Sequence, residues 1–358
     1  MNLSLAGTPI CGPFDVMIAP RFVGLCGTDI QIYRGAIHGA ANVLGHEGVG
    51  VVTEVGSEVN DWFLGDAVAF NPVNPVVQND ALGRSFDGLF QERILVGNAG
   101  SNDWLINRIP INLLTPVGAL IAPVSAAIYS SELAAVQHNR GKAVVVGDGP
   151  MALLNSVILR LSGFESVLLI HGDSGRGNWA VQNGYFDQGD VISRRGDVVG
   201  NVIERMSGEL ADVAIICTPG EAVEQAARDA LAYLKPGGLV NFISDAIPPV
   251  ISLGTGDLKV HELQLRNHCG LPVAGHAEGF ESENLKTVRV TGQHGISSAH
   301  VQASVTQLIE NPQPFDKLIT DVVNFDDAHS FISSAVEWSL GRGVGDRPMK
   351  TVIEINPT

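Results

Sequence analysis

Residues 143–152 read AVVVGDGPMA, an apolar run that leads into a glycine-rich turn and then into a helix-forming segment. A GxGxxA pattern between a strand and a helix is typical of a turn that binds the diphosphate of a dinucleotide. Gly147 permits the tight turn, Gly149 lets the backbone approach the phosphates, and Ala152 lets the helix pack closely on the strand. Pro150 suits the first helical position, where the helix N-terminus offers N–H groups to a phosphate.

The next strand outward, expected over residues 167–170, should end near the residue that holds the adenosine ribose. NAD sites place a carboxylate there, whereas this chain reads His171-Gly172-Asp173. A histidine with Arg176 five residues on tolerates or pairs with a 2′-phosphate, which slightly favours NADP over NAD. Asp173 could still reach the ribose and reverse that preference. The predicted cofactor-binding residues are Gly147, Asp148, Gly149, Pro150, Met151, His171, Asp173, Arg176, Cys217 and Thr218.

The turn lies within a regular alternation of strands and helices that follows residue 125. Near-continuous apolar strands separated by helices predict a parallel sheet covered on both faces. The earlier part has short strands between glycine and proline turns and predicts a β-rich domain. We expect strands over 15–19, 48–55, 66–70, 89–96, 143–146, 167–170, 212–217, 239–243 and 349–355, and helices over 150–162, 175–183, 221–234, 298–310 and 325–336.

The composition limits the class of protein. A chain of 358 residues predicts two domains, and 45% hydrophobic with 17% charged residues predicts a well-buried globular protein. The net charge of -16 argues against nucleic acid or an anionic membrane as a partner. Four widely spaced cysteines favour a reducing compartment, and neither a basic N-terminal region nor a membrane-length apolar run is present. We therefore expect a cytoplasmic protein.

Two short stretches carry residues that bind metals. Cys26-Gly27-Thr28-Asp29 is followed twenty residues later by Gly45-His46-Glu47. Thiolate, imidazole and carboxylate form a ligand set that suits zinc, and catalytic zinc sites use three protein ligands and keep the fourth position open. Asp29 is placed to accept a hydrogen bond from a ligand histidine. Taken singly, Cys26 fits a small buried apolar residue as well as it fits a ligand, His46 fits a hydrogen-bonded polar residue equally well, and Glu47 could also be structural.

Together these segments resemble the zinc-containing medium-chain dehydrogenases, the family of alcohol, sorbitol and threonine dehydrogenases, and the pattern is most similar to the sugar and polyol members. The similarity extends over most of the chain in the family's order. It includes the Gly147 turn and the stretches GLCGTDIQIYRG (24–35), LGHEGVGVVTEVG (44–56), DGLFQERILV (87–96) and LKPGG (234–238).

The resemblance implies an α/β protein with a GroES-like catalytic domain of residues 1–124 and 296–358 and a Rossmann domain of residues 125–295. It implies one catalytic zinc and NAD(P) as cofactors, and a homo-oligomer, either dimer or tetramer. The residue roles that it implies are zinc binding by Cys26, His46 and Glu47, proton transfer from the substrate by Thr28, and a place in the substrate pocket for Tyr33.

The chain departs from the family pattern at several positions. Residues 71–85 contain no cysteine, so we expect no structural zinc. Ala122 stands where sugar-type members have a glutamate that helps to hold the metal or its water. Gln31 replaces the proton-relay histidine of alcohol dehydrogenases, and His38 is a distant substitute.

Residues 252–285 look like an insertion. They are glycine-rich and irregular, and they carry His261, Arg266, His268 and His276. This segment could shape a substrate pocket or an oligomer contact, but a surface excursion is the preferred interpretation.

The expected reaction interconverts a secondary alcohol and a ketone. Residues 290–295 (VTGQHG) resemble an element of sugar and sugar-phosphate members, which favours a polyol, sugar, amino-sugar or cyclitol as substrate. One alternative is a zinc-free reductase of quinones or enones from the same superfamily. Another is a non-catalytic nicotinamide-binding protein. Bound zinc separates the first alternative from the main hypothesis, and turnover of any alcohol separates the second.

Overall fold

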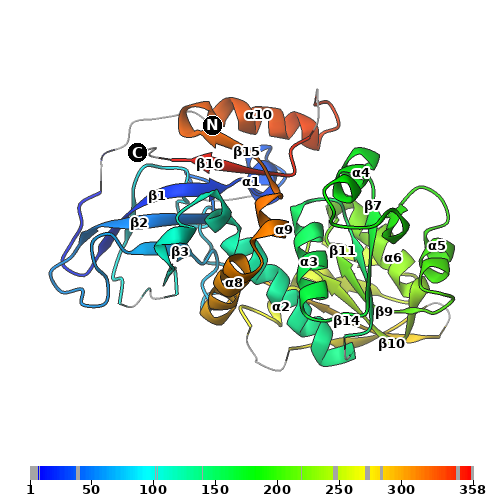
Figure 1. Ribbon diagram of the computed structural model, residues 1–358. Helices are drawn as coiled ribbons and strands as arrows, with labels where there is room; N and C mark the ends of the chain where they lie inside the picture. Colours follow the sequence, from blue (N-terminus) through cyan, green and yellow to red (C-terminus); the bar gives the residue numbers. More distant parts are fainter. Residues whose placement is uncertain are drawn as a thin grey trace. The chain divides into compact units, whose positions relative to one another are not determined.

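Two units divide the chain in the computed structural model, Met1–Ser125 with Gly295–Thr358 and Ala126–His294. The structure describes residues 7, 9–37, 41–100, 102, 104–138, 140–218, 220–244, 249–270, 275–282, 285–343 and 347–355. Each unit contains its own seven-stranded sheet (Figure 1).

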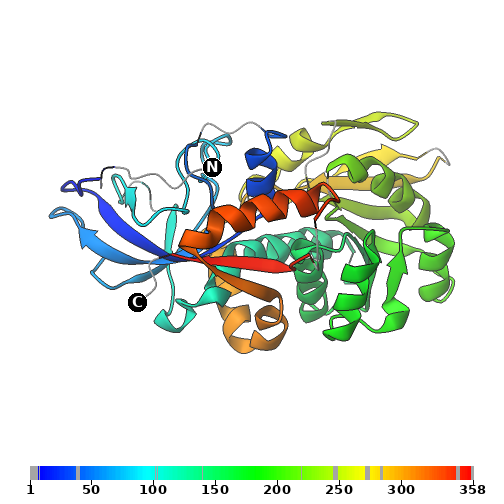
Figure 2. The ribbon, with the colours of Figure 1, turned by 90° about the horizontal axis from the view of Figure 1, so that it is seen from above.

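The first unit is built on a mostly antiparallel sheet in the order β15-β16-β1-β2-β3-β5, with β4 paired to β1. The strands are β1 (Val16–Gly24), β2 (Glu47–Val55), β3 (Ala67–Phe70), β4 (Ile94–Val96), β5 (Ile106–Arg108), β15 (Ile319–Asn324) and β16 (Lys350–Glu354). The helices are α1 (Gly27–Tyr33), α8 (Ser298–Glu310), α9 (Pro312–Asp316) and α10 (Ala328–Ser339), and α2 (Ile121–His138) begins in this unit. Figures 1 and 2 show α10 lying along β15 and β16.

Strand β1 brings distant parts of the chain together in this sheet. Its last residue, Gly24, pairs with Glu47 at the start of β2 on one side and with Val352 of β16 on the other. The amide of Leu25 then donates to the carbonyl of Thr351 over 3.0 Å. The start of α1, the start of β2 and the C-terminal strand therefore meet at one end of the sheet.

The second unit is a Rossmann-type sheet in the order β13-β14-β10-β9-β6-β7-β8, parallel except for the edge strand β13. The strands are β6 (Lys142–Val146), β7 (Ser166–His171), β8 (Val191–Ser193), β9 (Ala211–Ile216), β10 (Leu234–Phe242), β13 (Glu278–Glu281) and β14 (Thr287–Gly292). The helices are α3 (Pro150–Leu161), α4 (Ser174–Gln182), α5 (Val198–Arg205), α6 (Val223–Tyr233) and α7 (Val260–Leu265). A small hairpin pairs β11 (Val250–Ser252) with β12 (Asp257–Lys259).

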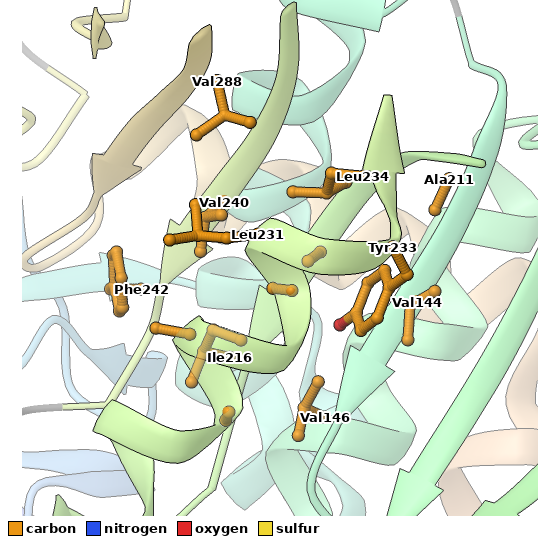
Figure 3. Close-up of a cluster of buried hydrophobic side chains, with 14 of the residues drawn as sticks. Val144, Val146, Ala211, Ile216, Leu231, Tyr233, Leu234, Val240, Phe242 and Val288 are labelled. Atoms are coloured by element: carbon orange, nitrogen blue, oxygen red, sulfur yellow. The ribbon is translucent and has the colours of Figure 1, made fainter. Parts of the chain in front are cut away.

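The core of the second unit explains why its strands read as continuous apolar runs. Side chains of β6, β9 and β10 meet those of α6 in one cluster that includes Val144, Ile216, Tyr233 and Phe242 (Figure 3). These four side chains are fully buried. Burial of a valine- or isoleucine-sized side chain contributes about 1.5–3 kcal/mol, so this cluster holds α6 on the sheet.

The expected strands and helices are present, with ends that differ by a few residues, and the strand expected over 89–96 is reduced to β4. The elements that were not predicted are the helices α1, α2, α5, α7 and α9 and the short strands β5, β8, β11, β12, β13 and β15. Asp197 immediately precedes α5 and caps it, because its side chain accepts from the amide of Gly200 over 2.8 Å. That capping residue is the signal for the helix that could have been read from the sequence.

The interpretation of residues 252–285 as a surface excursion is wrong for the part that the structure describes. Leu253, Leu258, Val260 and Leu263 are buried and belong to the core cluster of the second unit. The burial was not predicted because the glycines divide the apolar residues into short runs that have neither a helix nor a strand period. Residues 271–274, 283 and 284 lie outside the described part of the chain.

No apolar run of membrane length was expected from the sequence, but among the described residues one helical segment, Pro116–Ala135, is long and apolar enough to cross a membrane. It is 83% buried inside the protein. Since core helices meet the same criteria of length and composition, this burial identifies a core helix.

Candidate functional site

Cys26 is held at the start of α1 by a buried aspartate. It occupies the position before the first helical residue, and its amide donates to Asp29 Oδ2 over 2.9 Å. Asp29 is fully buried and also accepts from the amide of Gly45 over 3.0 Å. A single carboxylate thus joins the helix that carries Cys26 to the loop that leads to His46, as expected of a residue placed behind a metal site.

The same aspartate contacts the imidazole of His46, with 3.3 Å between Asp29 Oδ1 and His46 Nδ1. Burial alone raises the pKa of Asp29, but the His46 imidazole and the two amide donors outweigh burial and leave that pKa lowered. Burial lowers the pKa of His46, and the nearby Asp29 and Cys26 outweigh it and raise that pKa well above its usual value. With Nδ1 facing Asp29, Nε2 is the nitrogen left for a metal.

Glu47, the first residue of β2, is paired with a lysine from the other end of the chain. Its Oε2 accepts from Lys350 Nζ, which also donates to the carbonyl of Leu25 over 3.1 Å. Burial lowers the pKa of Lys350, but Glu47 and Cys26 outweigh it and raise that pKa. Gly24 makes room for the pair, because a Cβ there would lie 2.9 Å from Lys350 Cε and 3.0 Å from Glu47 Oε2.

The predicted ligands Cys26, His46 and Glu47 form one group, whose ligand atoms all lie within 4.8 Å of one another. The donor set fits zinc in its chemistry and its charge. With thiolate, two carboxylates (Glu47 and Asp29) and one ammonium, the group carries a formal charge of about −2 when His46 is neutral, which a divalent cation balances.

The other residues predicted around the metal are found on two helices. Thr28 lies in the first turn of α1, two residues beyond Cys26, and Tyr33 ends that helix with its hydroxyl 3.4 Å from Ser333 Oγ of α10. Gln31 also lies on α1. Ala122 is buried in α2 and offers no ligand atom, whereas His38 lies outside the described residues.

The glycine turn has the backbone that its sequence requires. Gly147 has a φ of +139°, and a Cβ there would lie 2.9 Å from the carbonyl oxygen of Cys217. Gly149 precedes α3, Pro150 is its first residue and Met151 its second, and Ala152 is fully buried. Since the first amides of a helix have no partner within it, the turn can present them to a phosphate.

Asp148 ties this turn to the loop that follows β7. Its Oδ2 accepts from the amides of Gly172 and Asp173 over 2.9 and 2.8 Å. Asp173 in turn caps α4, because its Oδ1 accepts from the amide of Gly175 over 2.8 Å. Both carboxylates are therefore engaged by backbone donors, and Asp173 has less capacity left for a ribose hydroxyl.

Two basic side chains lie beside the same loop. Arg176 is 8% exposed, and its Nη1 lies 4.0 Å from Asp148 Oδ1 and 3.5 Å from the position of a Cβ on Gly149. His171 ends β7, with Nδ1 3.0 Å from the carbonyl of Asp173. Arg176 therefore lies beside Gly149 and Asp148 of the glycine turn, whereas His171 lies at the end of β7, against the backbone of the following loop.

Cys217 and Thr218 follow β9 directly, and the amide of Cys217 donates to the carbonyl of Val146 over 2.8 Å. Burial raises the pKa of the Cys217 thiol, so the side chain is neutral. Thr218 is also buried. The pair thus lies beside the glycine turn at the carboxyl ends of β6 and β9, where dinucleotides bind in sheets of this kind.

Lys350 was not identified from the sequence as a partner of the candidate ligand Glu47. No local pattern marks it, because its partner Glu47 is 303 residues away. The one available signal was a lysine at the start of a strand whose other residues are apolar, since buried lysines are rare unless they are paired.

Comparisons with known proteins agree with this architecture. The alcohol dehydrogenase GroES-like domain matches residues 12–101. Sorbitol dehydrogenase 1 of Saccharomyces cerevisiae is 25% identical over 365 aligned positions, which cover 95% of this chain and 91% of that protein. The NADP-dependent isopropanol dehydrogenase of Thermoanaerobacter brockii is 28% identical over 65% of this chain and 69% of its own length. The structure of galactitol-1-phosphate dehydrogenase from Escherichia coli has a TM-score of 0.73 at 18% identity, covering 98% and 96% of the two chains.

Proposed function

We propose that this chain, a nicotinamide-dependent medium-chain dehydrogenase of the zinc type related to polyol dehydrogenases, interconverts a secondary alcohol and a ketone on a polyol or sugar-like substrate. The observation that carries the proposal is the convergence of Cys26, His46 and Glu47, with ligand atoms within 4.8 Å of one another. The similarity to a sorbitol dehydrogenase over most of the chain supports the substrate class.

The proposed mechanism assigns a task to each residue of the metal group. Zinc supplies a Lewis acid that makes the substrate hydroxyl more acidic, and the nicotinamide supplies the hydride acceptor. Cys26, His46 and Glu47 hold the metal, and Asp29 fixes the orientation of the His46 ring through Nδ1. Lys350 holds Glu47.

Proton transfer is assigned to Thr28. Its hydroxyl can accept the substrate proton while it donates its own, whereas the side chain of Gln31 does not titrate. Thr28 and Tyr33 lie at opposite ends of α1, and we assign Tyr33 to the wall of the substrate pocket. Because the relay histidine is replaced, the proton leaves through Thr28 to water in this proposal.

For the cofactor we propose NAD(P) at the Gly147 turn, with NADP slightly preferred. Asp173 is occupied as a helix cap, while Arg176 and His171 lie beside the loop after β7. A guanidinium can pair with a 2′-phosphate through two parallel hydrogen bonds. Asp148 lies 4.0 Å from Arg176 and neutralises part of the guanidinium charge, which limits the preference for NADP over NAD.

The test is elemental analysis of protein purified without chelator, beside a Cys26→Ala variant, followed by oxidation assays on polyols and sugars with NAD⁺ and NADP⁺. We expect about one zinc per chain in the parent and almost none in the variant, and polyol oxidation by the parent alone. Activity without zinc, unchanged by added metal, would favour a zinc-free reductase. Cofactor binding with no turnover of any alcohol would favour a non-catalytic role.

A further inference from the structure

Two histidines that are distant in the sequence meet at the end of β14. His268 follows α7 and His294 follows β14, and their Nδ1 atoms are 3.0 Å apart. The backbone fixes the pair, because the amide of Cys269 donates to the carbonyl of His294 over 2.8 Å and the amide of His294 donates to Asn267 over 3.2 Å. Only 6% of His268 is exposed.

The two rings lie edge to edge and share a hydrogen bond. Their planes differ by 19° and their centroids are 5.2 Å apart, whereas the two Nδ1 atoms are only 3.0 Å apart. The facing nitrogens therefore lie between the two ring centres. An N–H on one ring can therefore point along the line to the other nitrogen. One Nδ1 carries the proton and the other accepts it, so the two imidazoles adopt opposite tautomers.

This arrangement can take up one further proton without losing its hydrogen bond. The ring that donates through Nδ1 has a lone pair on Nε2, and protonation there makes the bond charge-assisted and stronger. A second added proton would leave no acceptor between the rings. The pair of His268 and His294 can therefore hold either no charge or a single positive charge with its hydrogen bond intact.

The topology places this pair at the end of the sheet that serves the nicotinamide half of a dinucleotide. The strand order reverses between β6 and β9, and the phosphate turn and ribose loop follow β6 and β7. In sheets of this type the second half of the dinucleotide lies over the carboxyl ends of the strands on the other side of the reversal. Those strands are β9, β10 and β14, and His294 is the second residue after β14.

We propose that His268 and His294 tune the affinity of this enzyme for the oxidised relative to the reduced cofactor. The nicotinamide ring is a cation when oxidised and neutral when reduced, so a positive charge nearby disfavours the oxidised form alone. At low pH the pair is charged and the reduced cofactor is favoured, whereas at high pH that bias disappears. The inference rests on the proposed function for the position of the nicotinamide.

Other titratable groups surround the pair and enter the test. His261 of α7 lies 6.0 Å from His294 between ring centroids, and Cys269 Sγ lies 3.9 Å from His268 Nε2. From α2, Tyr129 donates to the carbonyl of Asn267 over 3.1 Å, and burial raises the pKa of this phenol. Beyond Asn267, Arg266 contacts His276 and Glu278.

The experiment is titration calorimetry of NADP⁺ and NADPH from pH about 6 to about 9, with the ratio of the two dissociation constants as readout. Phosphate and ribose contacts act equally on both forms, so titration of His171 or of the 2′-phosphate cancels in the ratio. His268→Gln and His294→Gln keep a hydrogen-bonding side chain that takes up no proton. His329→Gln, on the exposed side of α10, is the matched control.

In the parent and the control we expect the affinity for NADP⁺, relative to that for NADPH, to fall by about five- to tenfold as the pH is lowered. In either pair variant the ratio should change less than about twofold. Tight binding of both forms with a ratio independent of pH in the parent, or an equal trend in the variants, would overturn this inference and leave the proposed function intact. Absence of cofactor binding by folded parent protein would overturn both.

Discussion

The carboxylate of Glu47 and the ammonium of Lys350 form a buried ion pair that joins the start of β2 to the start of β16. Their side chains are 9% and 4% exposed. Since Glu47 is also one of the three candidate metal ligands, this pair links the stability of the first unit to the candidate metal site.

Replacement of Lys350 by Met should destabilise the metal-free protein by about 3–5 kcal/mol, because it leaves a buried carboxylate without its partner. Added zinc should recover part of the loss, since the metal gives Glu47 a new positive partner. Denaturant unfolding with and without zinc measures both effects. Lys350→Arg is the control that keeps the charge. An equal loss in the two conditions would show that Glu47 does not reach the metal.

Replacement of Asp29 by Asn should weaken zinc binding by about 10–100-fold, the usual cost of losing the partner behind a ligand histidine. The amide can still accept one backbone N–H, but it does not orient the His46 ring as a carboxylate does. Competition with a chromogenic chelator measures the affinity. Asp66→Asn, which removes the partner of Arg108, should leave zinc affinity unchanged, and a comparable loss there would indicate a general effect on folding.

The metal-free protein should lose stability as pH rises above the ordinary titration range of histidine. The pKa of His46 is raised in the folded state, so its contribution is fully present below about pH 6.5 and is lost as pH rises through the raised value. The pKa of Asp29 is lowered in the folded state, so its contribution to stability is fully present above about pH 3.9 and is lost as pH falls through the lowered pKa.

Zinc binding should show the opposite trend and strengthen with pH, because Cys26 and His46 must release protons to bind the metal. Thermal unfolding of chelator-treated and zinc-loaded protein over a pH series measures both trends. A His46→Gln variant should lack the loss of stability at high pH, and persistence of that loss would assign it to another group.

Replacement of Gly147 by Ala should remove most cofactor affinity and destabilise the second unit by about 1–3 kcal/mol. The φ of +139° and the nearby carbonyl of Cys217 both oppose a side chain at this position. Calorimetry with NADPH and thermal unfolding give the two values. Gly189→Ala is the matched control, because a Cβ there meets nothing within 4 Å. Cofactor binding equal to that of the parent would disprove the assignment of the turn.

Replacement of Arg176 by Ala should reduce NADP affinity by about tenfold or more while NAD affinity changes little, because a charge-assisted hydrogen bond to the 2′-phosphate is lost. Arg93→Ala, which removes an exposed partner of Glu54, is the control. Parallel titrations with the two cofactors measure the preference. An equal decrease for both would place Arg176 at the shared diphosphate or in the packing of α4.

The sequence alone predicted those parts of the fold that depend on neighbouring residues. The strand, turn and helix around Gly147 were predictable because a positive φ and a close backbone approach require glycine at that position. The β-rich and Rossmann-type parts followed from the spacing of apolar residues. Two short motifs made Cys26, His46 and Glu47 candidate ligands, the family resemblance implied that role, and the structure groups their ligand atoms.

Only the tertiary structure decided which distant residues meet. The pairing of β1 with β16 brings Lys350 to Glu47, and the bridge at the end of β14 brings His268 to His294. The buried packing of Leu258 and Leu263 likewise became visible only in the folded chain. Turns and helices are set by interactions within a few residues, whereas these contacts depend on strand register and burial across the sheet, which no local pattern of residues encodes.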